Sequence, residues 1–94
     1  MRVIFARERN GEIHFRKRHP EVTLREVKEV FEFRMAVQPG YRGAWQGIGH
    51  TRARRFLVVV FKWGRKRETV FVLTAYPAKR KHVEVYLRIV GGRL

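Results

Sequence analysis

The stretch FLVVVFKWGRKRETVFVLTAY, residues 56–76, decides the fold. It contains two short apolar runs, at residues 56–61 and 69–75, on either side of a basic segment that includes Gly64. Short runs that are rich in β-branched and aromatic residues and bounded by turn signals are typical of strands buried on both faces. A glycine among polar residues is a common feature of hairpin turns. The stretch therefore predicts two central antiparallel strands, joined by a soluble basic turn with residues 65–67 at its tip.

An amphipathic helix is predicted ahead of this hairpin. Thr23 is followed three residues later by Glu26, the spacing at which two such residues cap a helix reciprocally. The apolar residues that recur at helical intervals and form one face are Leu24, Val27, Val30 and Phe31. The four glutamates within residues 21–32 are expected to form a solvated face of this helix.

The remaining segments predict shorter elements. Residues 2–6 form a strand, an Asn-Gly pair then signals a hairpin turn, and residues 13–15 form a short return strand or its remnant. Residues 44–51 predict a third strand, which two glycines kink. Residues 78–90 fit two structures, because one set of apolar residues alternates as in a strand and another recurs as in a helix that starts near Pro77. We favour the helix.

These elements predict one domain, residues 1–94, of the α+β class. It would have two layers, with an antiparallel sheet of four to five strands packed by the amphipathic helix and by a C-terminal helix. The chain has no cysteine, which excludes disulfides and cysteine-ligated zinc. Its apolar runs are shorter than the roughly 20 residues that cross a bilayer, so we expect a cytoplasmic protein.

Charge is the strongest functional signal of the chain. Twenty-two Lys and Arg face eight Glu, which gives a net charge of +14. Residues 33–94 contain fourteen of these basic residues and two Glu, so that region alone carries +12. A one-sided positive charge indicates a polyanion as ligand, and nucleic acid is favoured over an anionic membrane because no strongly basic amphipathic helix exposes an apolar face. A thermophile surface would explain the number of charges but not their sign.

Three stretches resemble, in the same order, the BrnT-type ribonuclease toxins and related small domains of the RelE and barnase group. They are KRHPEVTLREVKEVF at residues 17–31, GIGHTRARRFLVVVF at residues 47–61 and FVLTAYPAKRKHVEVYL at residues 71–87. In that group a His and a turn residue precede an amphipathic helix, two strands follow, and a basic helix closes the domain. The region from the first of these stretches to the last spans about three quarters of the chain.

The resemblance implies a RelE- or BrnT-like α+β domain that cleaves RNA without a metal and is neutralised by a cognate antitoxin. It also implies that the residue at the end of the last strand is functional. The toxins usually have Arg at that position, whereas this chain has Tyr76. The N-terminal strand differs too, because RVIFARERNGEIHF replaces the usual strand and its acidic residue.

Metal-free RNA cleavage needs groups that move protons, and His suits this task because its pKa is about 6.5. The catalytic candidates are His19, His50 and Tyr76. His19 precedes the amphipathic helix, and His50 ends the third strand beside three arginines. The structural alternatives are a turn histidine, an edge-strand histidine and an aromatic residue that closes the sheet. His14 is predicted to be structural and half-buried on a strand, and His82 to lie on the outer face of the last element.

The candidates for binding RNA phosphates are Arg18, Arg52, Arg54, Lys79 and Arg80. We predict no metal or cofactor, because the chain has no Asp and half of its Glu lie in one short segment. The predicted function is a metal-independent ribonuclease toxin that cleaves RNA through attack of the 2′-hydroxyl. Its predicted partners are RNA and an acidic antitoxin, with homodimerisation left open. The alternatives are a non-catalytic RNA- or ribosome-binding protein on the same scaffold and a basic structural subunit of a larger complex.

Overall fold

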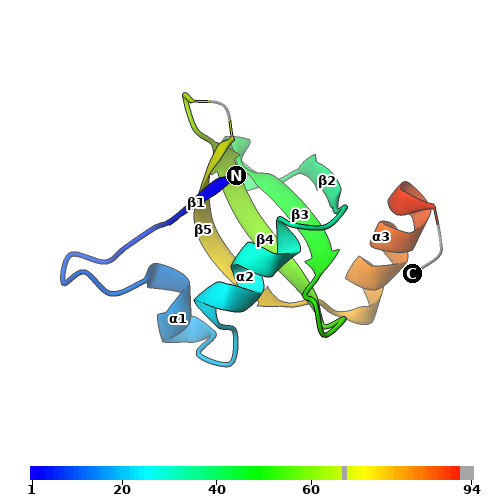
Figure 1. Cartoon of the computed structure of the whole chain (residues 1–94), viewed down its shortest axis with the longest axis horizontal. Coiled ribbons are helices and arrows are strands. Elements are labelled where there is room, and N and C mark those ends of the chain that lie inside the picture. Colours follow the sequence, from blue (N-terminus) through cyan, green and yellow to red (C-terminus); the bar gives the residue numbers. More distant parts are fainter. Residues whose placement is uncertain (67, 92–94) are drawn as a thin grey trace.

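The computed structural model describes residues 1–66 and 68–91, so Arg67 of the predicted basic turn lies outside the described residues (Figure 1). The elements follow in the order β1 (Arg2–Phe5), α1 (His14–Arg18), α2 (Leu24–Val30), β2 (Ala36–Pro39), the 3-10 helix η1 (Tyr41–Gly43), β3 (Trp45–His50), β4 (Phe56–Trp63), β5 (Thr69–Pro77) and α3 (Arg80–Val90). This arrangement confirms the α+β class.

The described residues form a five-stranded sheet in the order β1-β5-β4-β3-β2. The predicted hairpin of β4 and β5 lies at its centre, and the pairs β2–β3, β3–β4 and β4–β5 are antiparallel. β1 differs from the prediction, because it runs parallel to β5. A parallel neighbour needs a long crossover connection. Here the whole chain from α1 to β4 provides it, so the sheet is mixed at this edge.

β4 is buried on both faces from Leu57 to Val59, as its apolar run predicts, whereas β5 is fully buried on one face only and exposes Phe71 on the other, which differs from the prediction. Leu57, Val59 and Phe61 of β4 point into one core cluster together with Phe15 of α1 and the apolar face of α2. Val58 points into a second cluster on the opposite face, together with Tyr86 of α3. Figure 1 shows α2 across one face of the sheet and α3 standing at the β2–β3 side. The sheet is therefore sandwiched between α2 and part of α3.

The capping box of α2 is confirmed. The backbone N–H of Glu26 donates to Thr23 Oγ1 at 3.1 Å, and the backbone N–H of Thr23 donates to Glu26 Oε1 at 3.0 Å. The acidic face of α2 is not merely solvated, which corrects the prediction. Glu26 also accepts from the Arg55 guanidinium at 2.9 Å. Glu29 is only 8% exposed and accepts from the backbone N–H of Arg52. These contacts join α2 to the β3–β4 turn.

The N-terminal segment differs from the prediction. Only a remnant of the return strand exists at residues 13–15, an isolated antiparallel bridge that pairs Ile13 with Arg7. The chain turns into α1 at His14 instead, and this helix places Phe15 in the first core cluster at 1% exposure. Burial of the Phe15 ring under the sheet is worth more than a short ladder at its edge.

The last segment is a helix, as we favoured. Only its Tyr86 is buried, and Gly91 ends it with a left-handed backbone at φ 104°. That conformation suits glycine because glycine has no Cβ. No helix of residues 1–66 and 68–91 is long and apolar enough to cross a membrane.

The Glu26–Arg55 contact predicts a pH-dependent stability. Burial alone would raise the pKa of Glu26, but hydrogen bonds from Thr23 and Arg55 outweigh it and hold the pKa below its usual 4.5. The ionised carboxylate therefore stabilises the fold above about pH 4.5, and this contribution disappears as the pH falls through the lower pKa of the folded state. Glu26→Gln should cost about 1 kcal/mol of unfolding free energy at neutral pH, measured by urea denaturation.

The same comparison in acid, below the lowered pKa of Glu26, should bring wild type and Glu26→Gln together, because both then carry a neutral side chain. Glu84→Gln is the matched control, since Glu84 forms an exposed pair with Arg80 at 3.6 Å. It should change stability at neither pH. A difference between Glu26→Gln and wild type that persists in acid would show that the carboxylate charge is not the cause.

Candidate active site

The end of β5 projects beyond its neighbour β1. The parallel pairing covers only Thr69 to Val72 of β5, because the register runs from Arg2↔Thr69 to Phe5↔Val72. Beyond that point α1 takes the place of a strand beside β5, as Figure 1 shows. The last residues of β5 therefore lie between α1 on one side and the beginning of α3, which follows Pro77. This junction brings α1 next to a distant part of the chain, the segment that runs from the end of β5 into α3.

Tyr76 of β5 lies between two histidines at this junction. Its ring centroid is 5.6 Å from that of His19 and 6.1 Å from that of His82. The segment that ends α1 supplies His19, and the first turn of α3 supplies His82. Two titratable rings therefore flank one phenol. We call these three residues the His–Tyr–His cluster.

The position of His19 follows from the burial of Phe15. Phe15 anchors α1 on the core, and the helix ends when the backbone N–H of His19 donates to the Phe15 carbonyl at 2.8 Å. Pro20 follows, so the helix cannot continue through it. The His19 Nδ1 atom lies 3.9 Å from Oε1 of Glu21.

His82 is held in a different state. The backbone N–H of Lys79 donates to His82 Nδ1 at 2.9 Å, an interaction that caps α3. Burial lowers the pKa of His82, and the charges of Lys81 and Lys79 lower it further. Because Nδ1 accepts a hydrogen bond, the neutral ring carries its proton on Nε2. His82 is therefore a neutral hydrogen-bond donor.

A hollow of about 810 Å³ opens beside the cluster. Its lining includes His14, Lys17, Arg18, His19, Thr74 and Tyr76. Polar and titratable side chains from α1 thus face the exposed end of β5 across a space large enough for a nucleotide. The lining contains two cations, Lys17 and Arg18, and one acid, Glu8, which contacts His14. Its charged side chains are therefore net positive, which favours a phosphate group.

The predicted catalytic set is only partly assembled. His19 and Tyr76 are in contact, but the contacts of His50 are with other residues. The His50 ring stacks on Phe33 with centroids 4.9 Å apart, and its Nδ1 lies 2.8 Å from the Thr51 carbonyl oxygen. It also meets the edges of Phe56 and Tyr86. These contacts describe a structural ring in the second core cluster.

The predicted phosphate-binding residues are also divided. Arg18 lines the hollow, and Lys79 lies at the start of α3 next to His82. Arg80 is exposed in the first turn of the same helix and pairs only loosely with Glu84. Arg52 is already engaged, because Glu32 accepts from its guanidinium at 2.8 and 2.9 Å. Arg54 is an exposed residue of the β3–β4 turn, with a left-handed backbone at φ 66°.

Two histidines lie elsewhere than predicted. His14 is not half-buried on a strand but begins α1, with an exposed ring whose Nδ1 lies 3.1 Å from Glu8 Oε1. His82 is not on the outer face of the last element but contacts Tyr76. Pro77 is the sequence signal for this contact with Tyr76. A helix that starts soon after Pro77 has His82 in its first turn, next to the end of the strand. Because residues 78–90 fit a strand as well as a helix, the sequence alone does not place His82 next to Tyr76.

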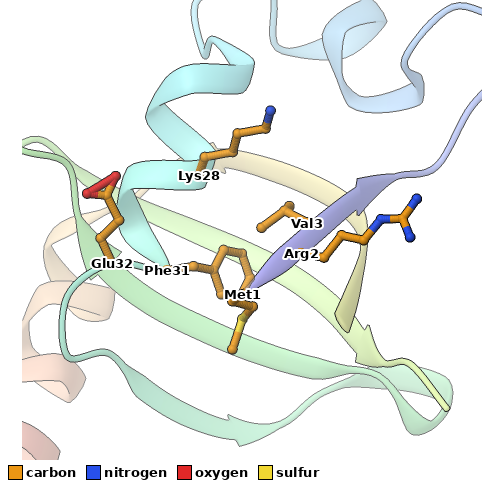
Figure 2. Close-up of a pocket in the computed structure, with 6 residues that line it drawn as sticks. All are labelled: Met1, Arg2, Val3, Lys28, Phe31 and Glu32. Carbon is orange, nitrogen blue, oxygen red and sulfur yellow. The ribbon is translucent and has the colours of Figure 1, made fainter. Parts of the chain in front are cut away.

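A second hollow of about 430 Å³ lies between β1 and α2 (Figure 2). Met1, Val3 and Phe31 form its apolar part, while Lys28 and Glu32 stand at its margin. No histidine lines it, and the described residues contain no group of three His, Cys, Asp or Glu placed to hold a metal ion. His14, His19 and Tyr76 line the first hollow, and His82 contacts Tyr76 without being part of that lining.

Comparison with known proteins identifies no family for this chain. No protein-family model matches the chain, and no curated protein matches it.

The state of His82 predicts a specific NMR result. The pKa of the ring should lie below 6.5, and the nitrogen shifts should report a proton on Nε2 at neutral pH. Lys81→Gln removes one of the charges that lower this pKa, so it should raise the pKa measurably. Arg88→Gln, two turns along the same helix, is the control and should leave it unchanged. A proton on Nδ1 at neutral pH would contradict the cap geometry.

Proposed function

We propose that the protein is a metal-independent ribonuclease that cleaves RNA through attack of the 2′-hydroxyl on the adjacent phosphate. The observation that supports this most is the His–Tyr–His cluster beside a cationic hollow. Such cleavage needs a group to take the 2′-hydroxyl proton, a group to protonate the leaving 5′-oxygen, and donors for the charge on the phosphate. Each of these roles has a candidate within the cluster.

His19 is the base in this proposal. Its ring accepts the proton of the 2′-hydroxyl, and Glu21 stabilises the charge that the ring acquires. Tyr76 gives its phenol proton to the departing 5′-oxygen as the P–O bond breaks. The products are a 2′,3′-cyclic phosphate and a 5′-hydroxyl. Proton transfer from His19 to the phenolate then restores both groups, because their rings are neighbours.

His82 and the surrounding cations act on the phosphate. The Nε2–H of neutral His82 donates a hydrogen bond to a non-bridging oxygen, and Lys17 and Arg18 supply positive charge from the rim of the hollow. Lys79 and Arg80 extend this charge along the start of α3. Arg52 has no part in this proposal because Glu32 holds its guanidinium.

The wider role that we propose is that of a toxin, as the resemblance to BrnT-type proteins implies. A chain with a net charge of +14 that cleaves RNA needs an inhibitor in the cell that makes it. An acidic antitoxin would bind the cationic rim and close the hollow. A gene for a small acidic protein beside the gene for this chain would support that role.

A non-catalytic RNA-binding protein is the second candidate. The net charge of +12 over residues 33–94 favours it, since phosphate contacts need no placed proton donors. Both candidates predict RNA binding that weakens as salt rises. They differ in the fate of the RNA.

An assay in excess EDTA separates the two candidates. Purified protein is incubated with single-stranded RNA, and the ends of the products are analysed. The ribonuclease should leave 2′,3′-cyclic phosphates, whereas a binding protein should leave the RNA intact with a salt-sensitive gel shift. Intact RNA at every salt concentration and pH would end the ribonuclease proposal.

Single substitutions test the assigned roles. His19→Asn and Tyr76→Phe should each lower the cleavage rate about a hundredfold, because proton transfer by a placed side chain contributes about 10²–10⁴. His50→Asn is the matched control, since it keeps a donor for the Thr51 carbonyl and lies outside the cluster. It should cleave at close to the wild-type rate. Equal losses in all three variants would indicate a folding defect and not a mechanism.

A further inference from the structure

Three residues of β5 lie on one face of the sheet, although their spacing is irregular. They are Phe71, Thr74 and Tyr76, and their partners in β4 are Lys62, Val60 and Val58. The register shifts between Val60 and Phe61, so that Val72 and Ala75 are both buried on the opposite face. Tyr76 of the His–Tyr–His cluster therefore shares a continuous surface with Phe71.

Helix α3 covers only part of this face. Val58 is fully buried beneath the second core cluster, Val60 is half-buried and Lys62 is exposed. The helix makes its main contacts with β2 and β3. Towards the β4–β5 turn the face is therefore open to solvent. Phe71 lies in this open part and is 40% exposed, which is unusual for an aromatic ring on a central strand.

Gly64 lies directly against the ring of Phe71. A Cβ atom on Gly64 would lie 3.1 Å from Cε2 of Phe71 and 3.0 Å from Cβ of Thr69. The ring therefore rests close against the chain, where any larger residue would displace it. The residue keeps 40% of its surface exposed, and an exposed aromatic ring of this kind can stack on a nucleic-acid base.

Polar groups accompany the ring on the same face. Gln46 is the cross-strand partner of Val60, and Gln38 is in turn the partner of Gln46. Their side chains are joined by a hydrogen bond of 2.6 Å, which leaves further amide donors and acceptors unused. Lys62 is exposed beside Phe71, and Arg65 and Lys66 follow in the turn. Glu68 is the single acid of that turn.

We infer that this open half of the sheet binds single-stranded RNA that continues from the strand held at the His–Tyr–His cluster. The inference rests on the proposed function for the identity of the ligand. Phe71 stacks on a base and Lys62 contacts a phosphate. Phe71 and Tyr76 are roughly 15 Å apart at the usual rise of a strand, a distance that a few nucleotides span. A single strand is required because the bases of a duplex are already stacked on one another.

The test uses an RNA that cannot be cleaved. A dye-labelled single strand in which every 2′-hydroxyl is methylated binds without reacting, so fluorescence anisotropy reports affinity alone. Phe71→Leu keeps the apolar contact with the strand but removes the ring, and it should weaken binding about tenfold, as the loss of one base stack does. Phe71→Trp keeps a flat ring and should bind as well as wild type.

Phe33→Leu is the matched control. Phe33 is 39% exposed, almost the same as Phe71, but its ring stacks on His50 outside the open face. It should bind the methylated RNA with wild-type affinity. A matching duplex should bind all four proteins equally, because the duplex has no free base to stack on Phe71.

Unchanged binding by Phe71→Leu would overturn the inference, and so would a wild-type protein that does not bind the methylated strand. The outcome is separate from that of the proposed function. If RNA remains uncleaved but binding depends on Phe71, the ribonuclease proposal fails and the binding surface stands. If cleavage depends on His19 while binding ignores Phe71, the reverse holds.

Discussion

The pairing of β4 with β5 is the interaction on which the rest of the structure depends. It is the most extensive contact between two elements among the described residues. The side chains of the two strands contribute to both core clusters. A hairpin that is apolar on both faces cannot remain exposed to water on either. One face is covered by Phe15 of α1 and by α2, and the other by α3. Every other element is placed by the need to cover this pair.

The helices and β1 cover the two central strands unevenly. Both functional proposals concern parts of β5 that they leave uncovered. β1 pairs with only the first part of β5, so α1 lies beside the strand end and His19 reaches Tyr76. The chain enters α3 directly after Pro77, so His82 reaches Tyr76 from another direction. Because α3 then leans towards β2 and β3, the opposite half of that face stays open. The two proposed RNA contacts thus share strand β5.

The same arrangement of elements determines which cations are paired with acids. Glu26 of α2 binds Arg55, and Glu32, which follows α2, binds Arg52. These two pairs hold the β3–β4 turn and leave both arginines less available to an anion. The cations of α1 and of the first turn of α3 have no comparable partners in the described part of the chain, apart from the exposed Arg80–Glu84 pair. The net charge of the chain indicates a polyanion. Local pairing decides which cations remain available to it.

Much of the fold could be predicted from the sequence, because its signals are local. The apolar runs of β4 and β5, the Thr23 cap of α2 and the helical spacing of α3 each depend on neighbouring residues. The parallel pairing of β1 and the short helix α1 depend on burial against distant residues, and no local pattern encodes them. The candidate site also combines residues that the sequence predicts with contacts that depend on the tertiary structure. His19 and Tyr76 were predicted, whereas the contact of His82 and the separate position of His50 needed the tertiary structure.

We propose that His19, Tyr76 and His82 together form one site for a phosphate of RNA. The most direct measurement is to titrate the protein with a nucleoside 2′,3′-cyclic phosphate and follow the histidine ring signals by NMR. We predict that the signals of His19 and His82 move together with one apparent affinity, while that of His50 stays still. Movement of His50 alone, with His19 and His82 unaffected, would contradict the account.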